Sequence, residues 1–290
     1  MADRIVERLV ECVQEEALQE RQEAWPRGLT GTATCSCIRP ERPGLLQLAF
    51  GGRHAFYRTL HHDDERHRVP DLVCIHAAGS SPSTWDRVAA TLTSAGWTVH
   101  TLHLPGHGPL PHRRASTLEQ FSAALSSEIS ALNLAPGFVL AGHSFGAFLA
   151  VPLASALGSA VGRLVLEELP TPPQQAGEPG PARRQTPIAL TAALVASRGA
   201  CSYHQMRSVL RLLRNPSPGW WSAADTLKIP MTLLAGGPRS HLDQQRMADF
   251  VTNHASFAML RTIEVGHHIH RDAPDRWLEE IAGWPTLWRT

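Results

Sequence analysis

Short apolar runs and amphipathic segments alternate along the chain from residue 71 to its end. The apolar runs are typical of buried strands, whereas the segments between them repeat apolar residues every three or four positions, as a helix does. Strands that alternate with helices predict an α/β fold with a mostly parallel central sheet flanked by helices. The expected strands are 72–75, 98–102, 138–140, 163–166, 231–234 and 259–265, and the expected helices are 83–95, 117–132, 243–252 and 273–281.

The chain before residue 71 follows other patterns. Residues 3–24 carry apolar positions on one face among Glu and Arg, which predicts an amphipathic helix that ends before Pro26. The runs 32–38, 45–50 and 54–60 are strand-like and are separated by glycines, which favours antiparallel hairpins. We expect residues 1–30 to form an appendage that packs on the core or on another copy of the chain, which would make the protein a homo-oligomer.

Residues 170–225 interrupt the alternation of strands and helices. The segment opens with several prolines and contains two probable helical stretches, 190–197 and 204–213. It follows the carboxyl end of a strand, where sheets of this kind place their ligands. We therefore predict a helical lid over 170–225 and a core made of 31–169 and 226–290; a plain surface excursion is the alternative. Trp220 and Trp221 would either line the substrate pocket or pack inside the lid.

The stretch Gly142-His143-Ser144-Phe145-Gly146 fits the pattern G-x-S-x-G and lies between an apolar strand and a helical segment. A serine on a sharp strand-to-helix turn has an exposed hydroxyl beside the positive end of the helix. Glycines at 142 and 146 would avoid collisions with the neighbouring strand and helix. This context indicates that Ser144 is a nucleophile rather than part of a chance match, with His143 as a pocket neighbour.

A serine nucleophile requires a base that takes its proton and an acid that orients that base. His267 follows the last expected strand and so lies at the same edge of the sheet as Ser144. Because the chain has sixteen histidines, only this position singles it out. His268 is the alternative base.

Four motifs occur in an order that resembles the α/β-hydrolase fold family. They are His76–Ser81, Leu104–Gly108, Gly142–Gly146, and Gly266-His267 with Asp272 and Pro274 behind it. The resemblance covers residues 45–288 and implies the α/β-hydrolase fold with a small helical lid. It also implies an oxyanion hole formed by the backbone N–H groups of Ala78 and Phe145, although Ala77 replaces the usual glycine after His76.

The same resemblance leaves three candidates for the triad acid. Most of the family carries an Asp after the seventh strand, where this chain has Arg239 or Ser240, and Asp243 comes several residues later. Some members, haloalkane dehalogenases among them, carry the acid at the end of the sixth strand, and Glu167 matches that position. A glutamate there would need a charged partner, which a protonated histidine supplies. We predict Glu167 as the acid, with Asp243, a helix cap by its pattern, and Glu168 as alternatives.

Composition excludes several other classes of protein. The chain is 43% hydrophobic with a net charge of +1, which gives no field for nucleic acid or an anionic membrane surface. The five cysteines are scattered, so we expect free thiols in a cytoplasmic protein. No motif supplies a complete set of metal ligands, and the charged run 61–67 reads as a solvated loop. We expect no metal and no organic cofactor.

These features favour a serine hydrolase that acts on an ester, lactone, thioester or activated carbon–carbon bond. Ser144 argues against the relatives that require an aspartate nucleophile. The alternatives are a non-hydrolytic biosynthetic enzyme that uses the same triad, for acyl transfer, cyclisation or elimination, and a ligand receptor with a vestigial triad. Apolar residues in the predicted lid favour a small hydrophobic substrate; they are Ile188, Leu190, Leu194, Val209 and Leu212.

Overall fold

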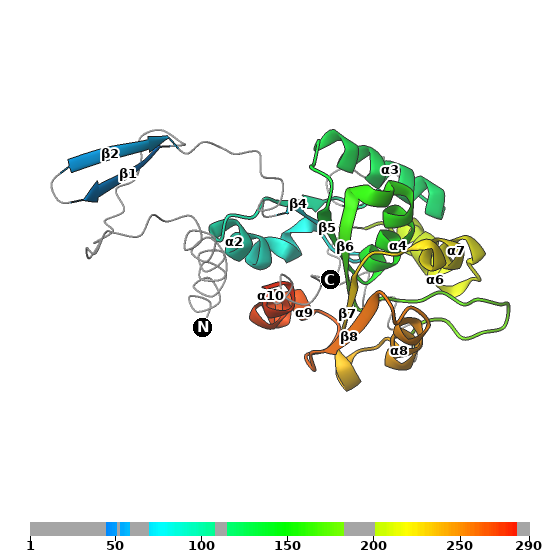
Figure 1. Ribbon diagram of the computed structural model, residues 1–290. Helices are drawn as coiled ribbons and strands as arrows, with labels where there is room; N and C mark the ends of the chain where they lie inside the picture. The colour runs from blue at the N-terminus through cyan, green and yellow to red at the C-terminus, as the bar shows by residue number, and fades with distance from the viewer. Residues whose placement is uncertain (1–44, 51–52, 59–69, 108–114, 183–200, 283–290) are drawn as a thin grey trace. The chain divides into compact units, whose positions relative to one another are not determined.

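A computed structural model of the protein describes residues 45–50, 53–58, 70–107, 115–182 and 201–282. The expected helices over 3–24 and 190–197, the run 32–38 and the charged loop 61–67 lie outside these residues. From residue 70 onward, the described chain is built around a six-stranded sheet in the order β4-β3-β5-β6-β7-β8 (Figure 1). All six strands are parallel. The strands are β3 (Leu72–Ile75), β4 (Val99–Leu102), β5 (Phe138–His143), β6 (Val161–Glu167), β7 (Met231–Ala235) and β8 (Ala258–Thr262).

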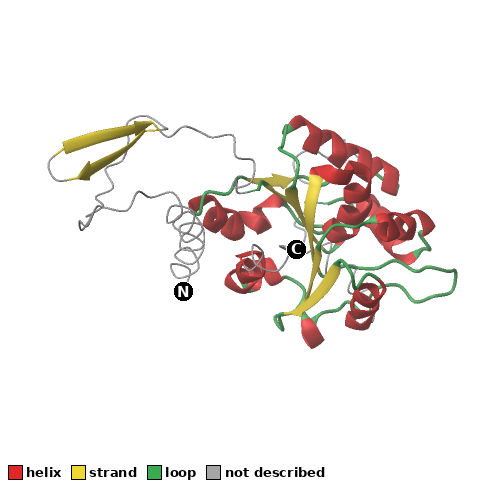
Figure 2. Ribbon diagram, viewed as in Figure 1, coloured by secondary structure: helices red, strands yellow, loops and turns green. Residues whose placement is uncertain are grey.

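Helices cover both faces of this sheet (Figure 2). The helices are α2 (Asp86–Ser94), α3 (Leu118–Ala131), α4 (Phe145–Leu157), α6 (Tyr203–Arg214), α7 (Pro218–Thr226), α8 (Gln244–Asn253), α9 (Ile269–Asp272) and α10 (Pro274–Ala282). Short 3-10 turns precede α2 (Pro82–Trp85), follow α4 (Gly158–Ala160) and follow β7 (Gly237–Arg239). The predicted α/β fold is therefore confirmed.

Two apolar clusters hold the layers together. One joins the sheet to α3, α4, α6, α7 and α8, and the other joins it to α2, α9 and α10 through Trp85, Ile269 and Trp277. Every residue of β5 is buried, which is why this central strand reads as a continuous apolar run instead of an alternating one. The helix α3 begins after Thr117, which forms a capping box with Gln120.

The strands β1 (Leu45–Phe50) and β2 (Arg53–Arg58) form an antiparallel sheet of their own, as their glycine-separated runs predict. They belong to a compact unit separate from the one that holds the described residues from Pro70 onward. The domain boundary expected at residue 31 stays a prediction.

The described part of the predicted lid contains α6 and α7. The helix α7 packs on the core, because Trp220 is fully buried, stacks on Phe148 and donates its indole N–H to the Phe148 carbonyl at 2.7 Å. Trp220 is thus a core residue, and the prediction that it lines the substrate pocket is wrong. A lid function for 170–225 stays a prediction.

Among the described residues, Cys74 and Cys201 are buried free thiols, as expected from the scattered cysteines. No helix in the same part of the chain has both the length and the apolarity that a membrane span requires.

Candidate active site

The turn between β5 and α4 holds Ser144 in a strained backbone conformation, with φ 54° and ψ −114°. Residues other than glycine rarely adopt a positive φ, so the surrounding structure must impose it. A Cβ at Gly142 would lie 2.5 Å from the Ala147 nitrogen, and one at Gly146 would lie 2.3 Å from the Ile75 carbonyl oxygen. Both glycines are therefore required for space, as predicted, and Ser144 stands at the start of α4.

The strand ladder places a glutamate opposite this turn. In the pairing of β5 with β6, His143 lies opposite Glu167, so Ser144 and Glu168 are the next residues on the two strands. The Ser144 N–H donates to the Glu167 carbonyl at 2.8 Å. The two strand ends are thus tied together at the edge of the sheet where the predicted nucleophile lies.

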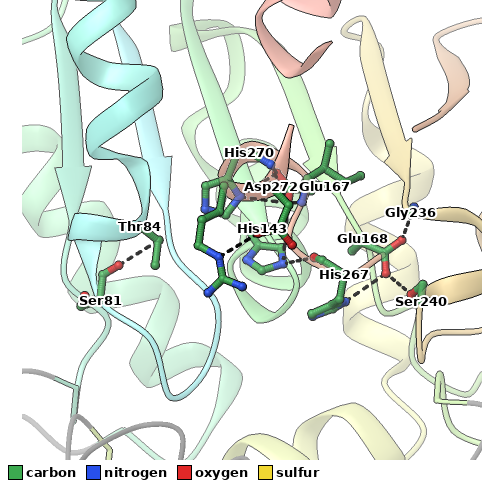
Figure 3. Close-up of polar contacts among 12 residues, drawn as sticks. Ser81, Thr84, His143, Glu167, Glu168, Gly236, Ser240, His267, His270 and Asp272 are labelled. Atoms are coloured by element: carbon green, nitrogen blue, oxygen red, sulfur yellow. Dashed lines mark hydrogen bonds and ion pairs between the residues drawn. The ribbon is translucent and has the colours of Figure 1, made fainter. Parts of the chain in front are cut away.

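Glu168 is the carboxylate that contacts His267. The Nδ1 atom of His267 lies 2.9 Å from Glu168 Oε2, and both side chains are largely or wholly buried (Figure 3). Glu168 also accepts hydrogen bonds from the Gly236 N–H at 2.6 Å and from the Ser240 hydroxyl. The prediction that Glu167 meets His267 is therefore wrong, and the alternative Glu168 takes that place.

These contacts decide the charge of Glu168. Burial raises the pKa of this carboxyl, but the hydrogen bond and charge of His267 and the donors Ser240 and Gly236 outweigh burial, so the pKa lies below its usual value. Glu168 is therefore ionised near neutral pH. Because a carboxylate only accepts hydrogen bonds, the proton of neutral His267 sits on Nδ1. The Nε2 atom then carries no proton and can accept one from a nucleophile.

The error over Glu167 has a structural cause. The strand β6 runs one residue further than predicted, so Glu167 is still part of the ladder and shares a sheet face with Val165. Its carboxylate points not to His267 but to His270, whose Nδ1 lies 2.9 Å away (Figure 3). Glu168 follows with φ 52°, a conformation that no sequence pattern predicts for glutamate.

Asp243, the other alternative acid, does not reach the site. It caps α8, where Oδ1 accepts the N–H of Gln245 at 3.1 Å. Of Arg239 and Ser240, the two residues expected at the usual position of the acid after β7, it is Ser240 that hydrogen-bonds Glu168. The sequence gives no reason to connect this serine with a glutamate on another strand.

Two predicted pocket residues also have other surroundings. His143 is buried, and its Nε2 donates to the His267 carbonyl at 2.6 Å, so it supports the histidine loop and does not line a pocket. Trp221 is half-buried and lines a hollow between α7 and α8 that none of the predicted catalytic residues lines. The predicted pocket role of His143 is therefore corrected, whereas that of Trp221 stays a prediction.

The predicted oxyanion donors lie where the first turn of α4 meets the loop after β3. Phe145 is the first residue of α4, so its N–H has no acceptor within the helix. The close packing of Gly146 on Ile75 and His76 brings this turn beside the loop that carries Ala78. Such a pair of backbone donors could stabilise an oxyanion.

His76 fixes the shape of that loop. Its Nε2 accepts the Leu104 N–H at 3.2 Å, and its Nδ1 donates to the Ala77 carbonyl at 2.8 Å. Burial lowers the pKa of His76 to about 3, so the ring stays neutral and can play both roles. The alanine that replaces the usual glycine at position 77 is buried.

Three further histidine rings surround His267. The rings of His143, His241 and His268 have centroids 4.8, 4.1 and 5.2 Å from it. Burial and repulsion from His267 lower the pKa of His268 to about 4. Burial, and to a smaller extent repulsion from the neighbouring histidines, holds the pKa of His143 well below its usual value. These two neighbours are therefore uncharged at neutral pH and add no permanent positive charge.

One group of ligand-type side chains among the described residues could hold a metal ion. It consists of His143, Glu167 and His270, all buried, with their ligand atoms within 4.8 Å of one another. The Glu167 oxygens, however, already accept N–H groups of Ile269 and His270, and His143 Nε2 already donates to a carbonyl. The Glu167 oxygens and His143 Nε2 are therefore already used in hydrogen bonds.

Removal of metal ions is therefore expected to leave activity unchanged. Dialysis against a strong chelator, followed by an assay against the untreated enzyme, checks this expectation. A loss of activity that a divalent ion restores would show that the histidine–glutamate group binds a metal.

The sequence as a whole was compared with those of known proteins. A sequence model described as the alpha/beta hydrolase family matches residues 72–280. The chain belongs to this family. The match spans the six-stranded sheet, Ser144, Glu168 and His267, so the candidate site lies within the family domain.

Two relatives are esterases by name. The esterase Rv0045c of Mycobacterium tuberculosis is 27% identical over 253 residues, which cover 74% of this chain and 82% of that protein. The pimeloyl-[acyl-carrier protein] methyl ester esterase of Aromatoleum aromaticum is 41% identical over 97 residues, which cover 33% of this chain and 36% of that protein. This alpha/beta hydrolase family member is therefore a hydrolase.

A solved structure agrees with the fold. The thioesterase domain from the curacin biosynthetic pathway superposes with a TM-score of 0.55 at 22% identity, covering 82% of this chain and 98% of that domain. At this level of identity the likeness concerns the fold alone.

Proposed function

We propose that the protein is a serine hydrolase that cleaves a carboxylic ester or thioester of a small hydrophobic acyl group. Ser144 is the nucleophile, His267 the base and Glu168 the acid that orients the base. The observation that carries this proposal is the 2.9 Å contact between His267 Nδ1 and Glu168, together with a half-buried serine held at a positive φ in the turn from β5 to α4, the setting of a nucleophilic serine.

The reaction would proceed through an acyl-enzyme. Ser144 Oγ attacks the carbonyl carbon of the substrate and gives its proton to His267 Nε2. The N–H groups of Ala78 and Phe145 stabilise the oxyanion. The tetrahedral intermediate then expels the alcohol or thiol, which takes the proton from His267. Water, activated by the same nitrogen, attacks the acyl-enzyme, releases the acid and restores Ser144.

Glu168 acts in both halves of this cycle. Its carboxylate keeps the His267 proton on Nδ1, so that Nε2 faces the reaction, and it stabilises the imidazolium that forms when Nε2 gains a proton. The donors from Gly236 and Ser240 keep the carboxylate ionised and fixed in place.

The names of the relatives support the choice of bond. Both sequence relatives are esterases by name, which supports the ester as the first substrate class to test. Thioesters and lactones would use the same triad and are the further arms of the test.

A panel of matched substrates tests the proposed function. It contains an ester, a thioester and a lactone of the same short- or medium-chain acyl group, each assayed with the wild type and with Ser144→Ala. We expect hydrolysis of the ester or thioester by the wild type only. Release of the alcohol with transfer of the acyl group to an added amine or alcohol, and no free acid, would instead indicate a transferase.

The pH dependence of this reaction should show one rising limb. A histidine base must be neutral to accept the serine proton, so the rate rises with pH as the base loses its proton. The pKa values of Glu168, His143 and His268 are all lowered, so these groups lose their protons at lower pH and add no second limb near neutral pH. A profile of kcat/KM with slope one on this limb agrees with a single base, and a flat profile contradicts it.

A further inference from the structure

Glu167 and its two histidine neighbours form a second buried network directly behind the proposed triad. We infer that Glu167, His143 and His270, here named the Glu167 clamp, position the backbone of the His267 loop relative to Ser144. The inference rests on the proposed function, because it assigns these residues to the placement of its base. None of the three touches the reacting atoms, so they are positioning residues.

The clamp holds the loop at three points. His143 Nε2 donates to the His267 carbonyl at 2.6 Å. Glu167 accepts the Ile269 N–H at 2.7 Å and the His270 N–H at 3.3 Å. The bonds therefore fix the peptide groups on both sides of His268, immediately after the proposed base (Figure 3).

Glu167 also connects this loop to the nucleophile. Its carbonyl accepts the Ser144 N–H at 2.8 Å, while its carboxylate holds the loop, and the next residue, Glu168, holds the His267 ring. One strand end thereby fixes the serine turn, the histidine loop and the histidine ring. A displacement of about 1 Å between catalytic groups can reduce a rate by about 10²-fold, so such a connection bears directly on kcat.

His270 completes the far side of the clamp. Its Nδ1 lies 2.9 Å from both Glu167 oxygens, and its ring stacks on Trp85 at 3.9 Å between centroids. The Nε2 atom of His270 is buried and has no hydrogen-bond partner. A buried polar atom without a partner costs free energy, so stability alone would favour an apolar ring at this position. We attribute the histidine to its bond with Glu167.

The chemistry of Glu167 makes Glu167→Gln the sharpest variant. All its close partners are N–H donors, namely Ile269, His270 and the His270 ring. A glutamine has a single acceptor oxygen, and its NH₂ group would face donors. We expect the loop to shift, kcat per active site to fall by about 10²-fold and KM to change little.

Val165→Ala is the matched control. Val165 is fully buried on the same face of β6, two residues before Glu167, and packs in the same apolar cluster as Trp85 and Ile269. It destabilises the fold without touching the hydrogen bonds of the loop. Active sites are counted in each variant by stoichiometric labelling with a fluorophosphonate, so kcat refers only to folded enzyme. Val165→Ala should keep the wild-type kcat per site.

A second variant covers the case in which Glu167→Gln does not fold. His270→Phe keeps a ring on Trp85 and leaves Glu167 its two backbone donors, so we expect about a tenfold loss of kcat per site. Wild-type kcat per site in the folded variant, or an equal loss in Val165→Ala, overturns the clamp. A wild type that neither hydrolyses the ester panel nor reacts with the fluorophosphonate overturns the proposed function instead.

Discussion

Ser144→Ala is expected to lower kcat by at least ~10³-fold and to leave the fold intact. The hydroxyl that would attack the substrate is lost, whereas the proposed oxyanion donors and the His267–Glu168 pair remain. An alanine also fits the turn, because it is smaller than the serine that stands there with φ 54°. Steady-state kinetics on the ester of the panel, with circular dichroism of both proteins, measures the effect.

The remaining activity of this variant is as informative as the loss. Binding and oxyanion donors alone sustain some catalysis above the uncatalysed rate in enzymes of this type. We therefore expect KM to change much less than kcat. Retention of most of the activity by a folded Ser144→Ala protein would mean that another group attacks the substrate.

Glu168→Gln is expected to lower kcat by about 10²–10⁴-fold, the range for removal of a triad carboxylate. A glutamine at 168 can still accept one hydrogen bond but cannot stabilise the imidazolium of His267. Its NH₂ group would also face the donors from Gly236 or Ser240. The loss should therefore fall on kcat rather than on KM.

Asp243→Asn is the matched control for this carboxylate. Asp243 caps α8 and has no contact with His267, and asparagine is as good a helix cap as aspartate. We expect kcat within about tenfold of the wild type and a loss in the free energy of unfolding below about 1 kcal/mol. A larger loss of kcat in Asp243→Asn than in Glu168→Gln would contradict our assignment of the acid.

The sheet and the serine turn could be predicted because each depends on local patterns. Apolar runs such as 72–75 and 231–234 became β3 and β7 almost residue for residue. The two glycines at 142 and 146 signalled close packing, and the structure has backbone atoms where their Cβ atoms would lie. The helix expected over 83–95 begins as a 3-10 turn, because proline and serine at its start favour a tight first turn.

The triad acid could not be predicted because it depends on where one strand ends. Two glutamates in succession point in opposite directions, so a shift of one residue at the end of β6 exchanges their partners. The sequence did contain one usable relation: Ser144 comes directly after the ladder residue His143, and Glu168 comes directly after its partner Glu167. The register of β5 with β6, however, follows only from the structure.

Buried polar side chains were the other source of error. His143 lies beside the nucleophile in the sequence and Trp220 lies in the expected lid, which suggests a pocket role for both, but each donates a hydrogen bond to a backbone carbonyl. A sequence does not tell whether such a donor has a partner inside the protein. The burial of these side chains therefore had to come from the fold.

The central claim is that Ser144 forms a covalent bond with the substrate carbonyl, and covalent labelling tests it most directly. The wild-type protein is treated with a fluorophosphonate, and intact-mass and peptide mass spectrometry locate the adduct. Our account predicts one adduct per chain, on Ser144, and none in Ser144→Ala. An unlabelled wild type, or an adduct on another residue that remains in Ser144→Ala, would contradict it.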